Sequence, residues 1–392
     1  MQEQLKILIF DGSFKTTPFI NRLVAGLAVK HQVYILGFNE KLPHKLENVT
    51  YVALGSNENK LRFLWTCLRL ASINQVIDTL KLIWQGDRKR LQQQNLSLAI
   101  KKIHPDIIHL QWPSVLPWFE EVLLEQKAPV VLSQRGFHGN VRPFVDKENF
   151  EYLRKWFPKL AGFHSVSKAI AVNGDKIWIS ENKIDKVIYT GLDIEKLMFL
   201  ESYTKSEPLK LLSIGRAHWI KGYDYALQTC KLLKEAGLSF RYTIIGGAGD
   251  EELQFLIHDL GLADCVSLKN RMPQTEVFEL MQNASVLLMP SIEEGIPNVV
   301  VEAMAVGLPV ISTDCGGVTE LIENEKEGWV VPVRDPKAMA EAVVNFQKLP
   351  IDTINLIRTA ARKKVEVQHS EEKMVKGMEE LYFEVLHPPT PL

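Results

Sequence analysis

Cysteine is scarce in this chain of 392 residues, and its placement suggests neither a zinc site nor a disulfide framework. The four cysteines stand far apart and form no CxxC pair: Cys67, Cys230, Cys265 and Cys315. Long apolar segments are also missing, since no uncharged run approaches the roughly 20 residues that span a bilayer. The first ten residues lack a basic segment followed by an apolar core, so we expect no secretory signal. These absences predict a protein of a reducing compartment, the cytoplasm.

A large net charge is absent as well, because the whole chain carries only −1. The two halves nevertheless differ. Residues 1–200 hold 27 Lys and Arg against 19 Asp and Glu, net +8, whereas residues 201–392 hold 19 against 28, net −9. The basic half predicts an anionic partner such as lipid or phosphate, and one hypothesis is peripheral contact with an anionic membrane at the inner face of the plasma membrane. The other hypothesis is an imbalance of solvated charge with no partner.

Residues 61–104 are too long for a simple crossover between strands and contain no strand-like run. Trp65 and Trp84 stand there among apolar residues. Six basic residues accompany them: Arg62, Arg69, Lys81, Arg88, Lys89 and Arg90. A pair of basic amphipathic helices suits a membrane surface. Helices with an apolar stripe toward the core and a solvated back are more frequent, and we expect that arrangement here.

Both halves alternate short apolar runs with longer amphipathic stretches. The runs are KILIF, QVYILGF, VTYVAL, DIIHLQW, PVVLSQ and GFHSVS in the first half, and LKLLSIG, FRYTIIG, DCVSLKN, SVLLMP and PVIST in the second. Strands that are apolar almost throughout and separated by helices are typical of parallel sheets covered on both faces. The pattern predicts an α/β protein of two Rossmann-like domains, each with parallel strands, and ligand in a cleft at the carboxyl ends of the strands.

The boundaries of these domains follow from composition. We expect an N-terminal domain over residues 1–193 and a C-terminal domain over residues 209–370. Between them, residues 194–208 turn polar and end in Pro208, which predicts a linker. Residues 371–392 are expected to form a terminal helix, able to pack back on the N-terminal domain, and a frayed tail.

The segment PSIEEGIPNVVVEAMAVGLPVIST, residues 290–313, holds two carboxylates of interest. Glu294 closes a polar turn, and Glu302 lies inside an apolar helix that should start with Pro297 at its first position and stop at Gly307. The N-terminus of this helix is an anion site, and helical side chains lean toward it, so both carboxylates can serve one ligand. Because ionised carboxylates accept hydrogen bonds from hydroxyls, the expected ligand is a diphosphate with a polyol at each end, which describes a nucleotide sugar.

Cations for such a ligand occur in LKLLSIGRAHWIKGYD, where Arg216 and Lys221 follow a strand. Two cations on a strand-to-helix loop can hold a diphosphate and stabilise the charge that develops on it as it leaves. The glycine loop in IIGGAGDEE allows close backbone approach, but it is not GxGxxG, so a dinucleotide site is only weakly indicated.

These motifs, in this order, resemble the retaining GT-B glycosyltransferases, especially family 4, also described as glycosyl transferases group 1. The segment EGIPNVVVE resembles their Glu-x7-Glu motif, and GRAHWIKGYD, IIGGAGDEE and GLPVISTDCGGVTELI extend the resemblance over most of residues 160–335. The N-terminal half is similar mainly in layout, which is usual in the family because that domain binds the acceptor. The resemblance thus implies an acceptor-binding N-terminal domain and a C-terminal domain that binds the nucleotide sugar. The resemblance implies a GT-B fold and retaining transfer of a sugar from a nucleotide-diphosphate donor to a glycan or lipid-linked acceptor. Bacterial surface-polysaccharide or glycoconjugate biosynthesis is the implied setting.

The resemblance also implies residue roles. Glu294 would contact the transferred sugar, Arg216 and Lys221 the diphosphate, and Glu302 the ribose, while His138 in SQRGFHG resembles a histidine near the donor sugar. The other implied donor-binding positions are Gly295, Ile296, Pro297, Asn298, Val299, Arg271, Met272, Gly247 and Gly12. Two positions depart from the family pattern: Pro297 replaces a frequent glycine, and Gly12 is single where relatives often have a pair.

Several expectations and alternatives remain. We expect no cofactor, metal or nucleic acid, since the two cations supply the positive charge, and a UDP-sugar donor comes before GDP- or ADP-sugars on family frequency. A nucleotide-sugar 2-epimerase of the same architecture, or a non-catalytic subunit that binds nucleotide or carbohydrate, are the alternative functions. A glycosidase with paired carboxylates would not need the cations. His109 is expected to be structural, and Glu293 a solvated turn residue.

Overall fold

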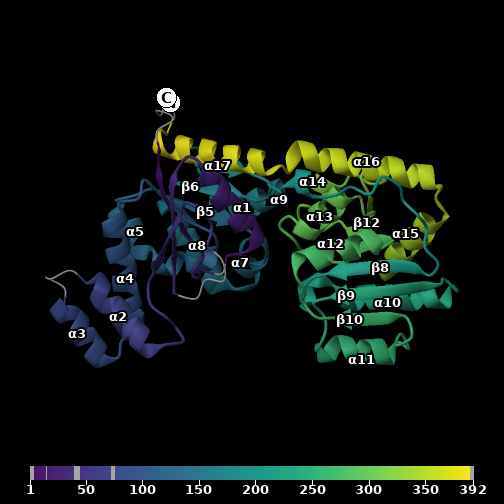
Figure 1. Cartoon of the computed structure of the whole chain (residues 1–392), viewed down its shortest axis with the longest axis horizontal. Coiled ribbons are helices and arrows are strands. Elements are labelled where there is room, and N and C mark those ends of the chain that lie inside the picture. The colour runs from purple at the N-terminus through teal and green to yellow at the C-terminus, as the bar shows by residue number, and fades with distance from the viewer. Residues whose placement is uncertain (1–3, 15, 39–44, 72–75, 389–392) are drawn as a thin grey trace. The chain divides into compact units, whose positions relative to one another are not determined.

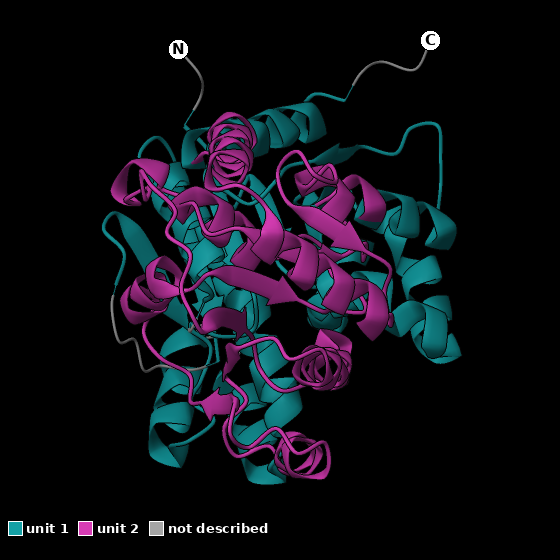
Figure 2. Ribbon diagram, turned by 90° about the vertical axis from the view of Figure 1, so that its right-hand side faces the viewer, with its two compact units in different colours: residues 1–166, 170–191, 371–392 teal, residues 167–169, 192–370 magenta. Residues whose placement is uncertain are grey.

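The computed structural model describes residues 4–14, 16–38, 45–71 and 76–388, which form two compact units (Figure 1 and Figure 2). Unit 1 comprises residues 1–166, 170–191 and 371–392, and unit 2 comprises residues 167–169 and 192–370. Each unit is built on its own sheet, in which all strand pairs are parallel.

Unit 1 has a seven-stranded sheet of order β3-β2-β1-β4-β5-β6-β7. The strands are β1 (Lys6–Phe10), β2 (Gln32–Gly37), β3 (Val49–Ala53), β4 (Ile107–Leu110), β5 (Val130–Gln134), β6 (Gly162–Ser165) and β7 (Asp185–Val187). Consecutive residues of a strand point to opposite faces. Ile7 and Ile9 therefore enter one core, and Leu8 and Phe10 enter another. This explains why the strands are apolar almost throughout.

Ten α-helices with assigned bounds in the described part of the chain accompany this sheet. They are α1 (Pro18–Leu27), α2 (Lys60–Leu70), α3 (Val76–Gln85), α4 (Arg88–Ile103), α5 (Glu120–Glu125), α6 (Gly136–Asn140), α7 (Arg142–Val145), α8 (Lys147–Trp156), α9 (Lys168–Ile177) and α17 (Glu371–Leu386). The terminal helix α17 packs on α1 (Figure 1), and Val375 occupies the space that a side chain at Gly26 would need. Of the tail expected to fray, residues 389–392 lie outside the described ranges.

Unit 2 has a six-stranded sheet of order β10-β9-β8-β11-β12-β13. The strands are β8 (Leu209–Ile214), β9 (Phe240–Ile245), β10 (Val266–Lys269), β11 (Val286–Met289), β12 (Val310–Thr313) and β13 (Trp329–Val331). The helices are α10 (Tyr223–Glu235), α11 (Glu251–Asp259), α12 (Gln274–Asn283), α13 (Asn298–Val306), α14 (Val318–Leu321), α15 (Pro336–Lys348) and α16 (Ile351–Gln368). Every residue of β11 and β12 is buried, as parallel strands in the middle of a covered sheet should be.

The expected linker, residues 194–208, is instead packed into unit 2. Tyr203 is buried, and its ring meets that of Phe346 edge-on with the centroids 5.9 Å apart. Buried Arg358 of α16 donates hydrogen bonds to the carbonyls of Leu200 and Gly307. The linker prediction was wrong because the segment is mostly polar and exposed, while a few of its residues, such as Tyr203, pack into unit 2. Composition alone does not reveal which residues these are.

For residues 61–104 we expected helices whose apolar stripes face the core, and this expectation was wrong for α2 and α3. The segment contains α2, α3 and α4 and no strand in its described part, but the apolar stripes of α2 and α3 do not face the core. Trp65 is 60% exposed and Trp84 is 88% exposed. The three helices instead enclose a small core of their own around Phe63, Cys67 and Leu91. Periodicity reveals an apolar stripe but not which side of the helix becomes buried.

Candidate active site

The candidate residues of unit 2 gather at the carboxyl ends of β8 and β11. These two strands are neighbours, and the sheet continues from β8 through β9 and β10 on one side and from β11 through β12 and β13 on the other. In open α/β sheets, ligands bind at this kind of switch point, outside the carboxyl ends of the strands. The strand order therefore places the loop before α10 beside the loop before α13.

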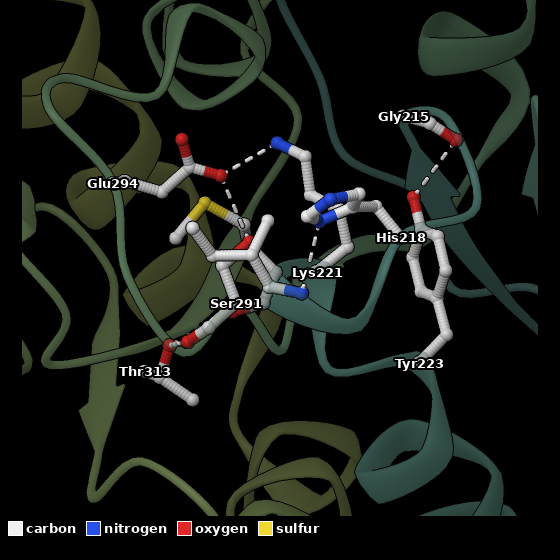
Figure 3. A network of polar contacts seen from close by, with 9 residues as sticks. Gly215, His218, Lys221, Tyr223, Ser291, Glu294 and Thr313 are labelled. Carbon is white, nitrogen blue, oxygen red and sulfur yellow. Dashed lines mark hydrogen bonds and ion pairs between the residues drawn. The ribbon is translucent and has the colours of Figure 1, made fainter. Parts of the chain in front are cut away.

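Lys221 and Glu294, 73 residues apart in sequence, form an ion pair across these two loops. Lys221 Nζ lies 2.6 Å from Glu294 Oε1, and the two side chains are 23% and 15% exposed. Ser291 Oγ donates a hydrogen bond of 2.9 Å to the same carboxylate oxygen. Figure 3 shows the lysine and the carboxylate pointing toward one another from their loops. A cation suited to a phosphate and an acceptor suited to a hydroxyl are thus held side by side.

More positive charge surrounds this pair. Arg216 is exposed on the loop after β8, and His218 follows it. Partial burial, and then the positive charges of Arg216 and Lys221, lower the pKa of His218. His218 Nδ1 accepts a hydrogen bond of 3.3 Å from the N–H of Ile220, which orients the ring (Figure 3). The loop therefore presents two cations and a histidine held toward its neutral form, an environment that favours an anion.

Two glycines allow the loops to approach closely. Gly222 has φ +61°, and a β-carbon there would lie 2.1 Å from the carbonyl oxygen of Pro290. Gly316 has φ +53°, and a β-carbon there would lie 1.7 Å from the carbonyl oxygen of Glu294. A larger residue at either position would have to move the loop that carries Glu294, so both glycines help to position the ion pair.

Helix α13 starts directly after this loop. Pro297 is its N-cap, with φ −77° and ψ 102°, and not its first helical residue as we expected. The carbonyl of Pro297 already accepts the first helical hydrogen bonds, from Val300 and Val301, while its ψ is still extended, which defines a cap. The other end is as predicted: the helix closes at Val306, and Gly307 adopts a left-handed conformation with φ +79°.

Glu302 lies in the second turn of α13 and contacts the start of α12. Its Oε1 accepts a hydrogen bond of 2.8 Å from Gln274 Nε2. Gln274 opens α12 two residues after Met272, so the turn that holds the expected donor-binding residues Arg271 and Met272 leads directly to the partner of Glu302. Sequence reasoning missed Gln274 and Ser291, because a lone amide and a lone hydroxyl carry no motif.

The loop after β9 contains two adjacent glycines with different surroundings, and the donor-binding role of Gly247 stays a prediction. The glycine that permits close approach is its neighbour Gly246, which has φ +92° and whose β-carbon would lie 2.6 Å from the carbonyl oxygen of Gly215. A β-carbon at Gly247 would instead meet Ile244 and Leu268 side chains at 3.2 Å. Gly246 therefore sets the distance between the two loops.

The two remaining candidates, Gly12 and His138, belong to unit 1. Gly12 follows β1 with φ +91°, next to Asp11, whose pKa is raised by burial to about 6. His138 lies in α6, after β5, half-buried and edge-on to the ring of Phe137 with the centroids 5.7 Å apart. Both therefore occupy the carboxyl side of the sheet of unit 1, whereas the other candidates belong to unit 2.

Sequence reasoning also missed Arg135, three residues before His138. Its side chain is buried, and burial lowers the pKa of Arg135 to about 9. Within the described ranges its guanidinium forms no ion pair. It donates to Gln111 Oε1 at 3.3 Å and lies 4.6 Å above the ring of Phe19. A buried cation without a carboxylate partner is unusual, and a single arginine in the sequence gives no sign of it.

His109 has the structural role that we expected. It is fully buried, with Nδ1 2.7 Å from the hydroxyl of Tyr382 in α17 and Nε2 2.8 Å from Ser133 Oγ. Ser133 Oγ also lies 2.7 Å from Nδ1 of buried His164. Burial lowers the pKa of His109 well below its usual value. Both ring nitrogens are used inside the protein, so His109 is a core residue.

Comparisons with known proteins agree with this geometry. Residues 198–364, which lie within unit 2, match the family model described as glycosyl transferases group 1. The chain is similar to the putative colanic acid biosynthesis glycosyltransferase WcaL of Escherichia coli, with 37% identity over 183 residues, 45% of each chain. It is also 25% identical to the N,N'-diacetylbacillosaminyl-diphospho-undecaprenol alpha-1,3-N-acetylgalactosaminyltransferase of Campylobacter jejuni, over 76% of this chain and 80% of that one. The match with WcaL thus spans about half of that relative's length.

A solved structure extends the likeness over nearly the whole chain. Anabaena Alr3699/HepE, crystallised with UDP-glucose, aligns with a TM-score of 0.73 at 15% identity, covering 96% of this chain and 99% of that chain. Similarity at this identity speaks to the fold. Together with the two parallel sheets, it confirms the predicted GT-B class of two Rossmann-like units.

Proposed function

We propose that the chain is a retaining glycosyltransferase of the glycosyl transferases group 1 family, whose model residues 198–364 match, and that it uses a nucleotide-diphosphate sugar. The contact between Lys221 and Glu294 at the switch point of the sheet is the observation that carries this proposal. In the absence of donor the two charges satisfy each other. A bound donor would supply a diphosphate to the lysine and sugar hydroxyls to the glutamate, so the pair is a ready-made site for both parts of the ligand.

The proposed chemistry needs no protein nucleophile. The acceptor hydroxyl attacks the anomeric carbon on the face from which the diphosphate departs, the bond from that carbon to the phosphate oxygen breaks, and the hydroxyl proton passes to the departing oxygen. Arg216 and Lys221 stabilise the negative charge that develops there. Glu302 accepts a hydrogen bond from the ribose in exchange for that of Gln274. A role of His138 toward the transferred sugar is implied only by the family resemblance and stays a prediction.

Different relatives support the proposed donor and the proposed acceptor. HepE was crystallised with UDP-glucose, which supports a UDP-sugar donor ahead of GDP- or ADP-sugars. The Campylobacter relative is named for a diphospho-undecaprenol-linked acceptor and WcaL for colanic acid biosynthesis. These names support a glycan or lipid-linked acceptor and a role in the assembly of a bacterial surface polysaccharide. A location at the cytoplasmic side of the plasma membrane is part of the proposal and rests on the excess of basic residues within residues 1–200.

A thermal-shift panel of UDP, GDP and ADP with their sugars tests the donor, because at equal concentration the ligand with the lowest dissociation constant raises the melting temperature most. The best donor is then used in a transfer assay with the wild type, Lys221→Ala and Glu294→Ala. We expect each variant to lose about 100-fold or more in rate, as when one transition-state contact is removed. The matched control is Lys231→Ala, an exposed lysine of α10, which should transfer at the wild-type rate.

Three outcomes would contradict the proposal. Wild-type rates in Lys221→Ala or Glu294→Ala would remove these residues from the reaction. Epimerisation of the donor sugar in the absence of any acceptor would favour a nucleotide-sugar 2-epimerase. Nucleotide binding without turnover, across a panel of polyprenyl-diphosphate and oligosaccharide acceptors, would favour a non-catalytic binding subunit.

A further inference from the structure

Helices α2 and α3 each present a stripe of large apolar side chains to solvent. On α2 the stripe has the spacing i, i+4, i+7, and on α3 it has the spacing i, i+3, i+7. The exposed fractions are Leu61 80%, Trp65 60%, Leu68 45%, Ile77 79%, Leu80 50% and Trp84 88%. We refer to these six side chains as the α2–α3 apolar face. Six large exposed apolar residues on two adjacent helices are more than the scattered single residues of an ordinary surface.

This face is not needed to hold the helices in place. Phe63 and Cys67 of α2 and Leu91 of α4 form a small core, against which Leu82 and Ile83 of α3 pack. The buried and exposed stripes of α2 lie on opposite sides of the helix, since Phe63 and Trp65 are about 200° apart at 100° per residue. Figure 1 shows α2 and α3 next to each other beside α4. The fold therefore leaves the α2–α3 apolar face available for a partner.

The charges around this face are mostly positive. Residues 60–90 contain seven Lys and Arg and two Asp, a net charge of +5 within the +8 of residues 1–200. All seven basic residues are exposed: Lys60, Arg62, Arg69, Lys81, Arg88, Lys89 and Arg90. On α3, Lys81 stands between Ile77 and Trp84, and on α2 the guanidinium of Arg69 lies 5.1 Å from the ring centroid of Trp65. Apolar and basic side chains are thus interleaved and not separated into two patches.

We propose that the α2–α3 apolar face docks on an anionic lipid bilayer, with the tryptophans and leucines in the interface and the arginines and lysines on the headgroups. Trp, Leu and basic residues combined on amphipathic helices suit this environment, where each basic side chain near the surface adds to binding. A second copy of the chain is the less suitable occupant. Two-fold pairing through the same face would bring its positive charges together. The inference goes beyond the proposed function, since lipid binding requires neither donor nor acceptor.

Flotation of the full chain with lipid vesicles tests the proposal. We expect the protein to float with vesicles of phosphatidylcholine containing about one third phosphatidylglycerol and to remain behind with pure phosphatidylcholine. Because headgroup attraction is screened by salt, binding at ~0.1 M salt should weaken at ~0.5 M. The double variant Trp65→Ser/Trp84→Ser should bind about tenfold more weakly, as expected when two interfacial aromatic residues are lost. The control is Phe255→Ser in α11 of unit 2, where Phe255 is 64% exposed.

Any of the following results would overturn the inference. Equal flotation with both vesicle types would show that charge plays no part, and equal flotation of the double variant and the Phe255→Ser control would exclude the apolar face. A dimer seen by sedimentation equilibrium and dispersed by Trp65→Ser/Trp84→Ser would identify a second copy as the occupant. Circular dichroism and thermal melting of the double variant should match the wild type, because both tryptophans are exposed. Since no sugar donor is present, loss of flotation and loss of transfer are independent findings.

Discussion

Replacing Gly316 by alanine should disable the site by moving one backbone carbonyl. Gly316 has φ +53°, and the added β-carbon would lie 1.7 Å from the carbonyl oxygen of Glu294. The left-handed conformation costs an alanine about 1 kcal/mol. The clash requires a shift of more than about 1 Å in one of the two backbones, comparable to overpacking a core, for about 1–3 kcal/mol more. We therefore expect the free energy of unfolding to fall by about 2–4 kcal/mol.

The same shift of the loop should also lower the transfer rate of the enzyme molecules that remain folded. The loop that moves carries Glu294, whose carboxylate contacts Lys221. A displacement of about 1 Å in an active site can reduce the rate 100-fold. Urea denaturation would measure the change in stability, and transfer assays well below the melting temperature would measure the rate of the folded enzyme.

Gly237 provides the matched control for this substitution. It also has a left-handed backbone, φ +75°, and a β-carbon there would meet nothing within 4 Å. It follows α10, at the amino side of β9 and away from the candidate residues. Gly237→Ala should lose about 1 kcal/mol, the conformational part alone, and keep the wild-type rate. If Gly316→Ala were no less stable and no less active than Gly237→Ala, the loop contact would not position the site.

Three further predictions concern the donor, the fold of unit 2 and the pH dependence of stability. Glu302→Gln removes the charge that would accept the ribose hydroxyls, so nucleotide affinity, measured by calorimetry, should fall about tenfold, the value of one charge-assisted hydrogen bond; unchanged affinity would exclude the role. Arg358→Met leaves the buried carbonyl of Gly307 and the partly buried carbonyl of Leu200 without this donor, and it should lower the unfolding free energy by about 3 kcal/mol, measured by urea denaturation. The control is exposed Arg241→Met, which should have little effect. Burial lowers the pKa of His164 to about 3, so the unfolded state binds more protons below the usual value of 6.5 and stability should fall as pH drops below it. The slope approaches about 1.4 kcal/mol per pH unit, and His164→Asn should flatten it; an equal slope in both proteins would contradict the burial argument.

Much of the fold could be read from the sequence because its signals are local. Apolar runs bounded by loops predicted β1 as residues 6–10, and the end of α13 followed from Gly307, whose left-handed conformation closes the helix. The short strands β7 and β13 were not identified, since three residues carry too little pattern. The candidate residues came from motifs on loops that follow strands, and parallel strands bring such loops to one edge of a sheet.

Contacts between distant segments could not be read in this way. The pairing of Lys221 with Glu294 depends on β8 and β11 being neighbours, which neither loop encodes by itself. The assignment of the close approach to Gly246 and not Gly247 depends on which carbonyl lies opposite. Gln274 and Ser291 gain their roles only from the loops packed against them.

The sequence by itself determined the alternation of strands and helices, the placement of the polar loops and the residue types available at each, because these depend on neighbours along the chain. Tertiary structure alone decided which sides of α2 and α3 remain exposed, which glycines let two loops touch, and that residues 194–208 belong to unit 2. The physical reason is the same in each case. Burial and close packing depend on what lies across space, and an amphipathic stripe, a glycine or a polar segment has the same sequence whether or not another element covers it.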